Sequence, residues 1–379
     1  MSPAAIAETL PAARPGLVEW LDRQARLVFV LPAVVVILAF SIFPLLVSAY
    51  LALTRFRFVP GGFELRWAGT RNFDKLLFGS EQWHFLGKLA PWGPLRLALA
   101  ALIVGALVWW LVSYLRAGRI WWPGLLGRIV FAFVAGGLGV LFVRTLGAGG
   151  QLGSLGVTLF YVVAGCTLQF GLGLGLALLC AQPVPGRTFF RVVFFLPLMV
   201  TPVGIAYMFR MLADMSKGPF APLWQWAGLG EFAWASDPWL ARLVVVVGDS
   251  WQWIPFIFIV MLAALESQSR EEIEAAQLDG AGPLQIFRDL TWPAIAPVAA
   301  TVVLIRVIEA FKIIDLPNVL TNGGPGTATE SLTLHSFMLW RTLDLGGSAA
   351  VAYGLLFVTV VLCVSFFNLV VLARRERSP

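Results

Sequence analysis

Long apolar runs dominate the chain and alternate with more polar segments. A helix that crosses the hydrocarbon core of a bilayer needs about 20 mostly apolar residues. We predict eight such spans, which are Val28–Leu53, Pro94–Leu115, Arg128–Thr145, Leu155–Ala181, Phe189–Met211, Trp239–Leu265, Trp292–Leu316 and Ser348–Leu372. The pattern therefore predicts an all-α fold, a polytopic membrane helical bundle of about eight spans.

The composition supports this membrane location. Of the 379 residues, 59% are hydrophobic and only 13% are charged, and the mean hydropathy is +0.83. Soluble domains contain about a quarter charged residues. The net charge of +6 does not indicate nucleic-acid binding. Lys and Arg flank the spans, where they meet anionic lipid headgroups, and no basic patch is interleaved with exposed aromatic residues. We expect membrane lipid as a partner, and no nucleic acid.

The distribution of charge bears on orientation. Residues 1–27 carry acidic and basic side chains together, and the apolar run that follows is too long for a signal-peptide core, so we expect an uncleaved first span. If the N-terminus is inside, arginines such as Arg116, Arg191 and Arg270 fall on the cytoplasmic side. This agrees with the positive-inside rule, by which cytoplasmic loops carry an excess of Lys and Arg. Six basic residues of the segment 54–93 would then lie outside. Charge alone leaves the orientation open.

The stretch Ser269–Pro293 carries the most specific local pattern. Ser269 with Glu272 forms a capping box, which predicts the start of a helix. Gly280 and Gly282 permit a turn with positive φ, and Pro283 suits the first position of a second helix. The stretch therefore predicts two short helices with a sharp break between them. The small apolar face of the first helix can dock in a partner's groove.

This stretch resembles the EAA loop of binding-protein-dependent ABC importers. The resemblance is carried by Glu274, Ala275, Ala276, Asp279, Gly280, Ala281, Phe287 and Pro293. In that family the loop is the coupling helix, held in a cleft of a cytoplasmic ATPase. The resemblance implies that Glu274 and Gly280 are the critical positions of this contact, and that the loop faces the cytoplasm.

The resemblance covers about residues 28–87 and 152–375. Within this family the chain is similar to the carbohydrate-uptake branch, and in particular to the larger permease of maltose and glycerol-3-phosphate systems. The family's common core has six spans, so the apolar residues between these stretches are expected to form an insertion. The expected organisation is a cytoplasmic N-terminal segment 1–27, a first core span with an extracytoplasmic segment 28–87, an inserted two-span hairpin 88–151, and a core permease domain 152–379 with the coupling loop 266–291.

The resemblance also implies partners and an energy source. We expect a second homologous permease, two ATPase subunits that use ATP and Mg, an extracytoplasmic solute-binding protein, and the bacterial inner (plasma) membrane as location. The chain itself is expected to bind no cofactor and to be no enzyme. A phosphate-binding loop needs Gly-x-x-x-x-Gly-Lys-Ser/Thr. The one Gly-Lys pair, Gly87-Lys88, has Gln82 where the first Gly should be and is followed by Leu89.

Charged residues within the seventh span need an explanation, because a charge at mid-bilayer costs roughly 2.5–3.5 kcal/mol on insertion scales. Arg306, Glu309, Lys312 and Asp315 follow one another at intervals of three and so lie on neighbouring helix faces. Arg306 can pair with Glu309, and Lys312 with Asp315. Two interpretations stay open: ion pairs that hold helices together, or a polar wall of a translocation path.

The sixth span carries Asp249, Gln252, Trp253 and Phe256, again at helical spacing. A carboxylate, an amide and an aromatic face suit a polyhydroxylated solute, whose hydroxyls form hydrogen bonds while the apolar face of a sugar ring stacks on Trp. By the resemblance, these four residues, Arg306 and Lys312 lie at or beside positions that line the sugar site of the maltose permease. With Glu309 they form the predicted substrate-binding set.

Other candidate chemistry is sparse. Cys166, Cys180 and Cys363 lie in apolar runs without a partner at metal-ligand spacing, and His84 and His335 are far apart in the sequence. We expect no metal site and no catalytic residue.

These patterns together predict the permease subunit of an ATP-driven ABC importer for a sugar or related polyol, working by alternating access. The alternative is a secondary transporter or channel that uses an ion gradient through the charges of the seventh span. An acid–base enzyme using Glu309 or Asp249 lacks a nucleophile–base constellation. The identity of the solute and the role of the inserted spans stay open.

Overall fold

The computed structural model describes residues 29–116, 122–147, 150–182, 185–228 and 233–368. The α-helices are α2 (Phe43–Ala52), α3 (Arg71–Leu77), α4 (Gln82–Phe85), α5 (Pro94–Arg116), α6 (Trp122–Thr145), α7 (Ser154–Phe160), α8 (Cys166–Ala181), α9 (Arg187–Phe195), α10 (Pro202–Ala213), α11 (Ala221–Trp226), α12 (Pro238–Glu266), α13 (Arg270–Leu278), α14 (Pro283–Ile286), α15 (Trp292–Phe311), α16 (Asp315–Thr321), α17 (Leu332–Arg341) and α18 (Leu345–Phe367). Short π and 3-10 turns are η2 (Leu38–Ile42), η3 (Tyr161–Gly165), η4 (Leu196–Met199), η5 (Trp234–Ser236) and η6 (Phe287–Thr291), and the strands are β1 (Thr54–Val59), β2 (Gly62–Trp67), β3 (Gly87–Lys88) and β4 (Gln151–Leu152). The predicted segment 1–27 and the last residues of the predicted eighth span, 369–372, lie outside the described residues.

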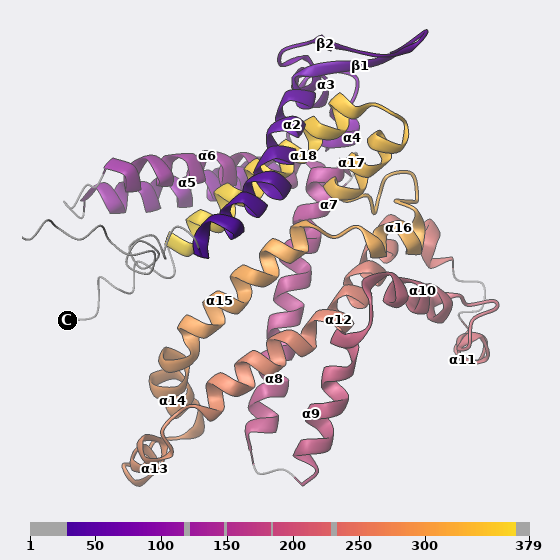
Figure 1. Ribbon diagram of the computed structural model, residues 1–379. Coiled ribbons are helices and arrows are strands. Elements are labelled where there is room, and N and C mark those ends of the chain that lie inside the picture. Colours follow the sequence, from indigo (N-terminus) through magenta and orange to yellow (C-terminus); the bar gives the residue numbers. More distant parts are fainter. Residues whose placement is uncertain (1–28, 117–121, 148–149, 183–184, 229–232, 369–379) are drawn as a thin grey trace, which may run out of the picture.

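The molecule has two distinct ends (Figure 1). At one end, the loop end, lie α13 and α14; at the other, the hairpin end, lie β1, β2, α3, α4 and α17. Seven helices in the described ranges are long and apolar enough to cross a membrane, and one bent pair could supply an eighth span. The predicted polytopic helical bundle is confirmed. The described residues also contain two small antiparallel sheets, β1–β2 and β3–β4.

The fifth predicted span, Phe189–Met211, is not one straight helix. The structure breaks it into Thr188–Met199 and Pro202–Ala213, which are bent by 101° relative to each other. Pro202 disfavours helical backbone at the residue before it. Thr201 is accordingly extended and caps α10, since its side chain accepts a hydrogen bond from the Gly204 N–H. The predicted segment is therefore helical but sharply bent, and it counts as an eighth span if the two pieces cross the membrane together.

The seventh span is displaced from the predicted Trp292–Leu316. One continuous helix covers Pro283–Phe311, because α14 runs through η6 into α15. The predicted second short helix is thus the beginning of this span. The helix ends at Phe311, with Lys312 as its cap residue. Pro317 lies within α16, a new helix that begins at Asp315.

Close contact between α8 and α12 forms the centre of the bundle. Ile257, Phe258 and Met261 of α12 are fully buried in a cluster that also includes α8 and α15. A Cβ placed on Gly173 of α8 would lie 2.8 Å from Ile257 Cβ, so the absence of a side chain allows the two helices to approach. This approach brings polar groups of the three helices within reach of one another.

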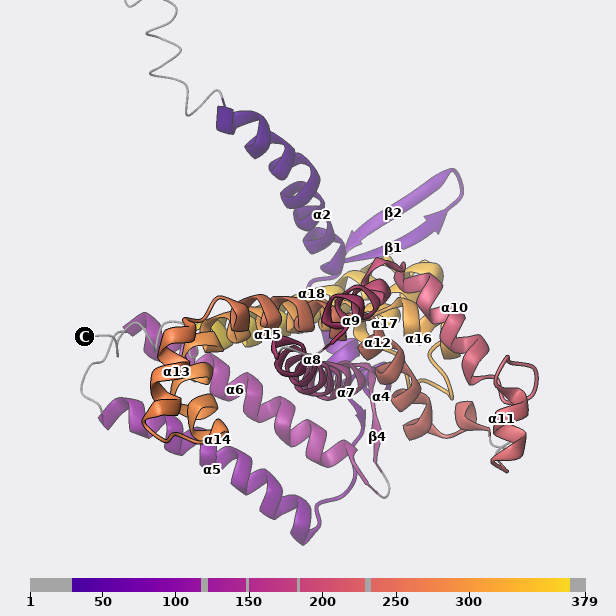
Figure 2. The same ribbon diagram turned by 90° about the horizontal axis from the view of Figure 1, so that it is seen from below.

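The inserted residues form α5 and α6, which pack against each other, and α6 also lies against α18. Both helices keep most of their surface exposed, with Leu102, Trp109 and Phe133 at the outside. Figure 2 shows this hairpin beside the bundle and, on another side, the helix that ends in α2 projecting away from it. Such apolar, exposed surfaces are suited to lipid or to another membrane subunit.

Candidate functional site

The loop end begins with α13 and its cap. Ser269 accepts a hydrogen bond from the Glu272 N–H, as the capping pattern predicts. Gly280 adopts φ +82°, which provides the predicted left-handed turn after the helix. Gly282 has φ −74°, so its predicted positive φ was wrong, and Pro283 starts the next helix as expected. One glycine, and not two, makes the break between the helices.

Helix α13 contains no buried residue. Leu278, its last residue, is 89% exposed, and Leu284 of α14 is 80% exposed. Large apolar groups exposed to this degree at a turn are typical of a contact surface. Of the predicted coupling positions, Glu274, Ala275, Asp279, Gly280 and Pro293 are exposed, and Ala276, Ala281 and Phe287 are half-buried.

A cleft of about 600 Å³ lies beside this loop, between the ends of α8 and α12 and the helices α13 and α14. Ile273, Gln277 and Ala281 line it from the loop. The loop is also tied to the spans, because Gln268 Nε2 donates to the Thr291 carbonyl at 3.1 Å. The exposed helix is therefore held beside the bundle by this hydrogen bond and by its chain connections to α12 and α14.

A polar cluster lies inside the bundle, where three helices meet. Arg306 of α15 forms an ion pair with Asp249 of α12, and its Nε donates to Gln169 Oε1 of α8. Gln169 Nε2 in turn donates to Asp249 Oδ2 at 2.8 Å. Arg306 is 1% exposed, Asp249 5% and Gln169 0%, so each group has its partner inside protein. Charges buried in this way are held by their partners.

Aromatic side chains lie beside this cluster. The Arg306 guanidinium is 4.9 Å from the centre of the Trp253 ring, and Trp253 meets Phe256 edge to face at 5.9 Å. Both aromatic residues are half-buried, whereas Gln252 is buried. The cation–π contact fixes the tryptophan ring in position. Of the predicted solute-binding residues, the structure thus gathers Asp249, Trp253, Phe256 and Arg306.

The predicted ion pairs of the seventh span were wrong. Arg306 pairs with Asp249 of another helix and not with Glu309. Glu309 instead accepts from Lys312 Nζ at 2.6 Å, and this pair is exposed at the end of α15. Asp315 lies in α16, beyond the end of the span, which separates it from the predicted pairing with Lys312. The two observed pairs lie in different environments, because Arg306–Asp249 is buried and Lys312–Glu309 is exposed.

Gln169 is the residue that our sequence analysis missed. It lies in α8, where it accepts from Arg306 and donates to Asp249 and Ser250. An amide within an otherwise apolar span was the available signal, because a polar side chain in lipid needs a partner. Its partners are 80 and 137 residues away in the sequence, and the helical pattern of one span does not identify them.

Comparison with known proteins decides the family. The model of a family described as "binding-protein-dependent transport system inner membrane component" matches residues 171–377, which is more than half of the chain. The chain belongs to this family. It is a multi-pass protein of the inner membrane and the permease subunit of an ABC importer.

The permease is similar to several named proteins. It is 33% identical over 214 residues to a probable ABC transporter permease, y4oQ, of Sinorhizobium fredii, covering 55% of this chain and 67% of that one. It is 30% identical over 225 residues to the trehalose/maltose transport system permease MalF of Thermococcus litoralis, covering 59% and 75%.

Among solved structures, a bacterial ABC transporter involved in alginate import matches with a TM-score of 0.64 at 18% identity, covering 93% of the permease and 97% of that chain. This likeness confirms the fold.

Proposed function

We propose that the permease carries a sugar or related polyol into the cell, driven by ATP and Mg that separate ATPase subunits use. The observation that carries this proposal is the unburied helix α13, tied at both ends to the bundle that contains the Asp249–Arg306 cluster. Relatives named for trehalose/maltose and sn-glycerol-3-phosphate transport support the solute class. A second homologous permease, two ATPase subunits and an extracytoplasmic solute-binding protein complete the proposed assembly.

The continuity of the seventh span offers a route for coupling. A displacement of α13 reaches α14, which is one helix with α15 and therefore with Arg306. Arg306 contacts α12 through Asp249 and α8 through Gln169. A pull on the loop would thus move the three central helices relative to one another. Such a movement suits alternating access, in which nucleotide binding in the ATPases biases two states of the bundle.

The same geometry suggests how the solute is held. Asp249 and Arg306 satisfy each other and are nearly inaccessible, so we assign them the positioning of Trp253. Trp253 and Phe256 then offer half-buried rings on which the apolar face of a sugar can stack. Gln252, Glu309 and Lys312 are the proposed hydrogen-bonding groups for hydroxyls. Stacking with nearby polar groups suits a polyhydroxylated ligand better than an inorganic ion.

The loop can be tested with two glycines that differ in backbone conformation. Gly280→Val places a β-branched residue at φ +82° and is expected to lower ATP-dependent uptake at least tenfold, since the turn after α13 is strained. Gly282→Ala, at φ −74° with no atom within 4 Å of its added Cβ, is the matched control and should transport normally. Uptake is measured in proteoliposomes containing the permeases, ATPase subunits and binding protein, with and without ATP.

Two results would count against the proposal. Uptake by Gly280→Val at the level of Gly282→Ala would remove the coupling role of the loop. Robust uptake driven by an ion gradient, in vesicles without ATPase subunits, would favour a secondary transporter instead.

A further inference from the structure

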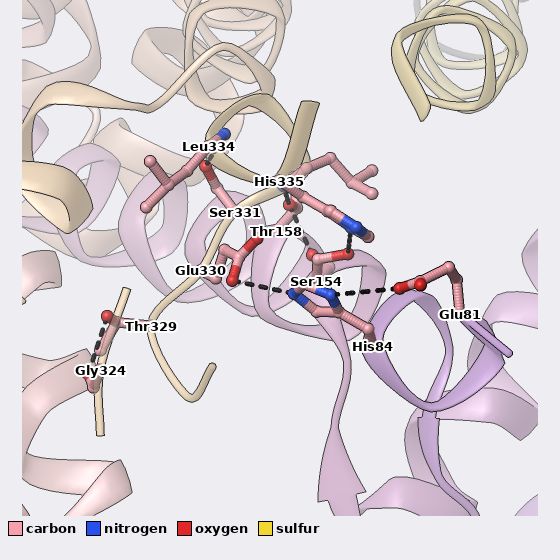
Figure 3. A network of polar contacts seen from close by, with 11 residues as sticks. Glu81, His84, Ser154, Thr158, Gly324, Thr329, Glu330, Ser331, Leu334 and His335 are labelled. Carbon is pink, nitrogen blue, oxygen red and sulfur yellow. Dashed lines mark hydrogen bonds and ion pairs between the residues drawn. The ribbon is translucent and has the colours of Figure 1, made fainter. Parts of the chain in front are cut away.

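The hairpin end brings together two histidines and two glutamates that are remote in the sequence (Figure 3). Glu81 precedes α4 and His84 lies within it, whereas Glu330 lies two residues before α17 and His335 lies within that helix. The two imidazole rings stack with centroids 3.9 Å apart and planes inclined by 23°. From the sequence we expected no metal site because the histidines are far apart along the chain, but the fold places them side by side.

The donor atoms of this cluster are close enough to share a cation. His84 Nε2 lies 2.9 Å from Glu330 Oε2, and His84 Nδ1 lies 3.7 Å from Glu81 Oε2. One donor atom of each of Glu81, His84 and His335 lies within 4.8 Å of the other two. Zn²⁺ binds imidazole and carboxylate at about 2.0–2.2 Å, so binding requires the stacked rings and the Glu81 side chain to turn and move closer together around the ion.

Two buried atoms of the cluster have no hydrogen-bond partner. They are His335 Nε2 and Glu330 Oε1. His335 is 0% exposed and Glu330 5% exposed, so these atoms are also shielded from water. Buried polar atoms normally have partners. Here a ring nitrogen and a carboxylate oxygen, both of them metal-ligand types, are held in protein without a competing bond.

The second ring nitrogen of each histidine already has the kind of partner that ligated histidines use. His84 Nε2 meets the Glu330 carboxylate, and His335 Nδ1 lies 2.9 Å from Ser154 Oγ. Histidines that bind a metal through one nitrogen usually donate the other N–H to an oxygen, which sets the ring orientation. This arrangement leaves His84 Nδ1 and His335 Nε2 for a cation.

The surroundings hold these groups in place. Ser331 caps α17 and also donates to the Ile313 carbonyl at 2.6 Å, and the Leu332 N–H donates to Thr158 Oγ1 at 2.8 Å. The chain directly after Glu330 is therefore fixed to α7 and to the segment that follows the seventh span. Glu81 and His84 are only partly buried, which leaves access from solvent.

Electrostatics in the cluster favour a positive ion. The carboxylates of Glu81 and Glu330 lie on either side of the His84 ring, 3.7 Å from Nδ1 and 2.9 Å from Nε2. Glu330 is buried, so water screens its negative charge little. Two carboxylates placed in this way attract a cation to the histidines.

We propose that this cluster binds a divalent transition-metal ion, with Zn²⁺ as the best match, through Glu81, His84 and His335, supported by Glu330 and Ser154. Two imidazoles and a carboxylate form a donor set that suits zinc. The ion would join the α4 segment to α17 and stabilise the hairpin end of the permease. This site is independent of the proposed solute and of the coupling loop.

The test uses the full chain in detergent, purified with a tag that lacks histidine and stripped of metal. Because the chain contains two histidines, imidazole ligation can come from this cluster alone. Zn²⁺ binding is measured by competition with a chromophoric chelator, and Co²⁺ is used as a spectroscopic substitute. We expect one Zn²⁺ per chain with micromolar or tighter affinity, and visible Co²⁺ bands of the intensity typical of four-coordinate nitrogen and oxygen ligation.

Variants assign the ligands. His84→Gln and Glu81→Gln are each expected to weaken Zn²⁺ binding at least tenfold, and Glu330→Gln about 10–100-fold, as for other partners of ligated histidines. Glu64→Gln, which changes an exposed carboxylate on β2, is the control and should bind like the unaltered chain. Absence of Zn²⁺ binding, unchanged affinity in His84→Gln, or a near-ultraviolet thiolate band showing that cysteines bind the Co²⁺ would each overturn the proposal.

Discussion

At the scale of residues, the ion pair of Asp249 and Arg306 dominates the interior of the permease. Its two groups come from different helices, and Gln169 bridges them from a third. A charge left alone in such a place is costly, because neither water nor another ion can replace its partner. The pair therefore ties the stability of the bundle to the position of Trp253.

Replacing one partner should show this dependence. Arg306→Met leaves the Asp249 carboxylate buried and unpaired, and we expect a loss of about 3–5 kcal/mol in stability. The double variant Arg306→Met with Asp249→Leu removes both charges and should recover much of that loss. Thermal unfolding in detergent measures both. A double variant as unstable as the sum of the two single changes would show that the groups are not coupled.

The two neighbouring tryptophans of α12 provide a comparison for solute binding. Trp253 contacts Arg306 and Phe256, whereas Trp251 packs edge to face on Phe209 at 5.9 Å. Trp253→Ala is expected to raise the KM of uptake at least tenfold, because stacking of the sugar ring is lost. Trp251→Ala should change KM less than threefold. Equal effects of both changes on KM, measured with radiolabelled solute, would argue against the assignment of Trp253.

At the scale of elements, glycine determines how closely α8 approaches α12. Gly173 faces Ile257 and the backbone of Phe258, and Gly171, half a turn away, has no atom within 4 Å of an added Cβ. The two glycines therefore share one helix but lie on faces with different surroundings. Helix propensity alone favours alanine over glycine at both positions.

These surroundings predict opposite effects of the same substitution. Gly173→Ala should lower the melting temperature, since the new methyl group would lie 2.8 Å from Ile257 Cβ and force the helices apart. Gly171→Ala should leave it unchanged or raise it slightly. The measurement is thermal unfolding of the purified permease, followed by intrinsic tryptophan fluorescence. A melting temperature for Gly173→Ala equal to that of Gly171→Ala would contradict the packing argument.

At the scale of the whole molecule, the loop end and the hairpin end lie at opposite ends of the spans (Figure 1). The proposed function requires the loop end to face the cytoplasm, where the ATPases are. The charge pattern left this orientation open, because basic residues also occur in the segment that forms the β-hairpin.

Single cysteines test the orientation. In a chain whose three cysteines are replaced, Glu271→Cys marks exposed α13, and Glu64→Cys marks β2 at a position whose side chain is 42% exposed. A membrane-impermeant maleimide added to spheroplasts should label Glu64→Cys but reach Glu271→Cys only after the membrane is opened. The reverse pattern would place the loop outside and remove the basis for ATPase coupling.

The sequence by itself determined where most spans run, how α13 is capped and which loop resembles the family's coupling helix. These features are local, since they depend on hydropathy over about 20 residues and on capping over a single turn. Even the break at Pro202 and the early start of the seventh span at Pro283 were marked by residues whose backbone effects are local. The bounds that we predicted for the fifth and seventh spans followed hydropathy and did not take these two prolines into account.

Only the tertiary structure decided which polar groups meet. Arg306 finds Gln169 across 137 residues, and His84 finds Glu330 across 246, so no periodicity within one helix could reveal either contact. Helix spacing shows which face a residue occupies, but the partner of that face depends on how separate helices pack. For this permease, the spans follow from local hydropathy, and its buried ion pair and histidine cluster follow from the packing of helices distant in sequence.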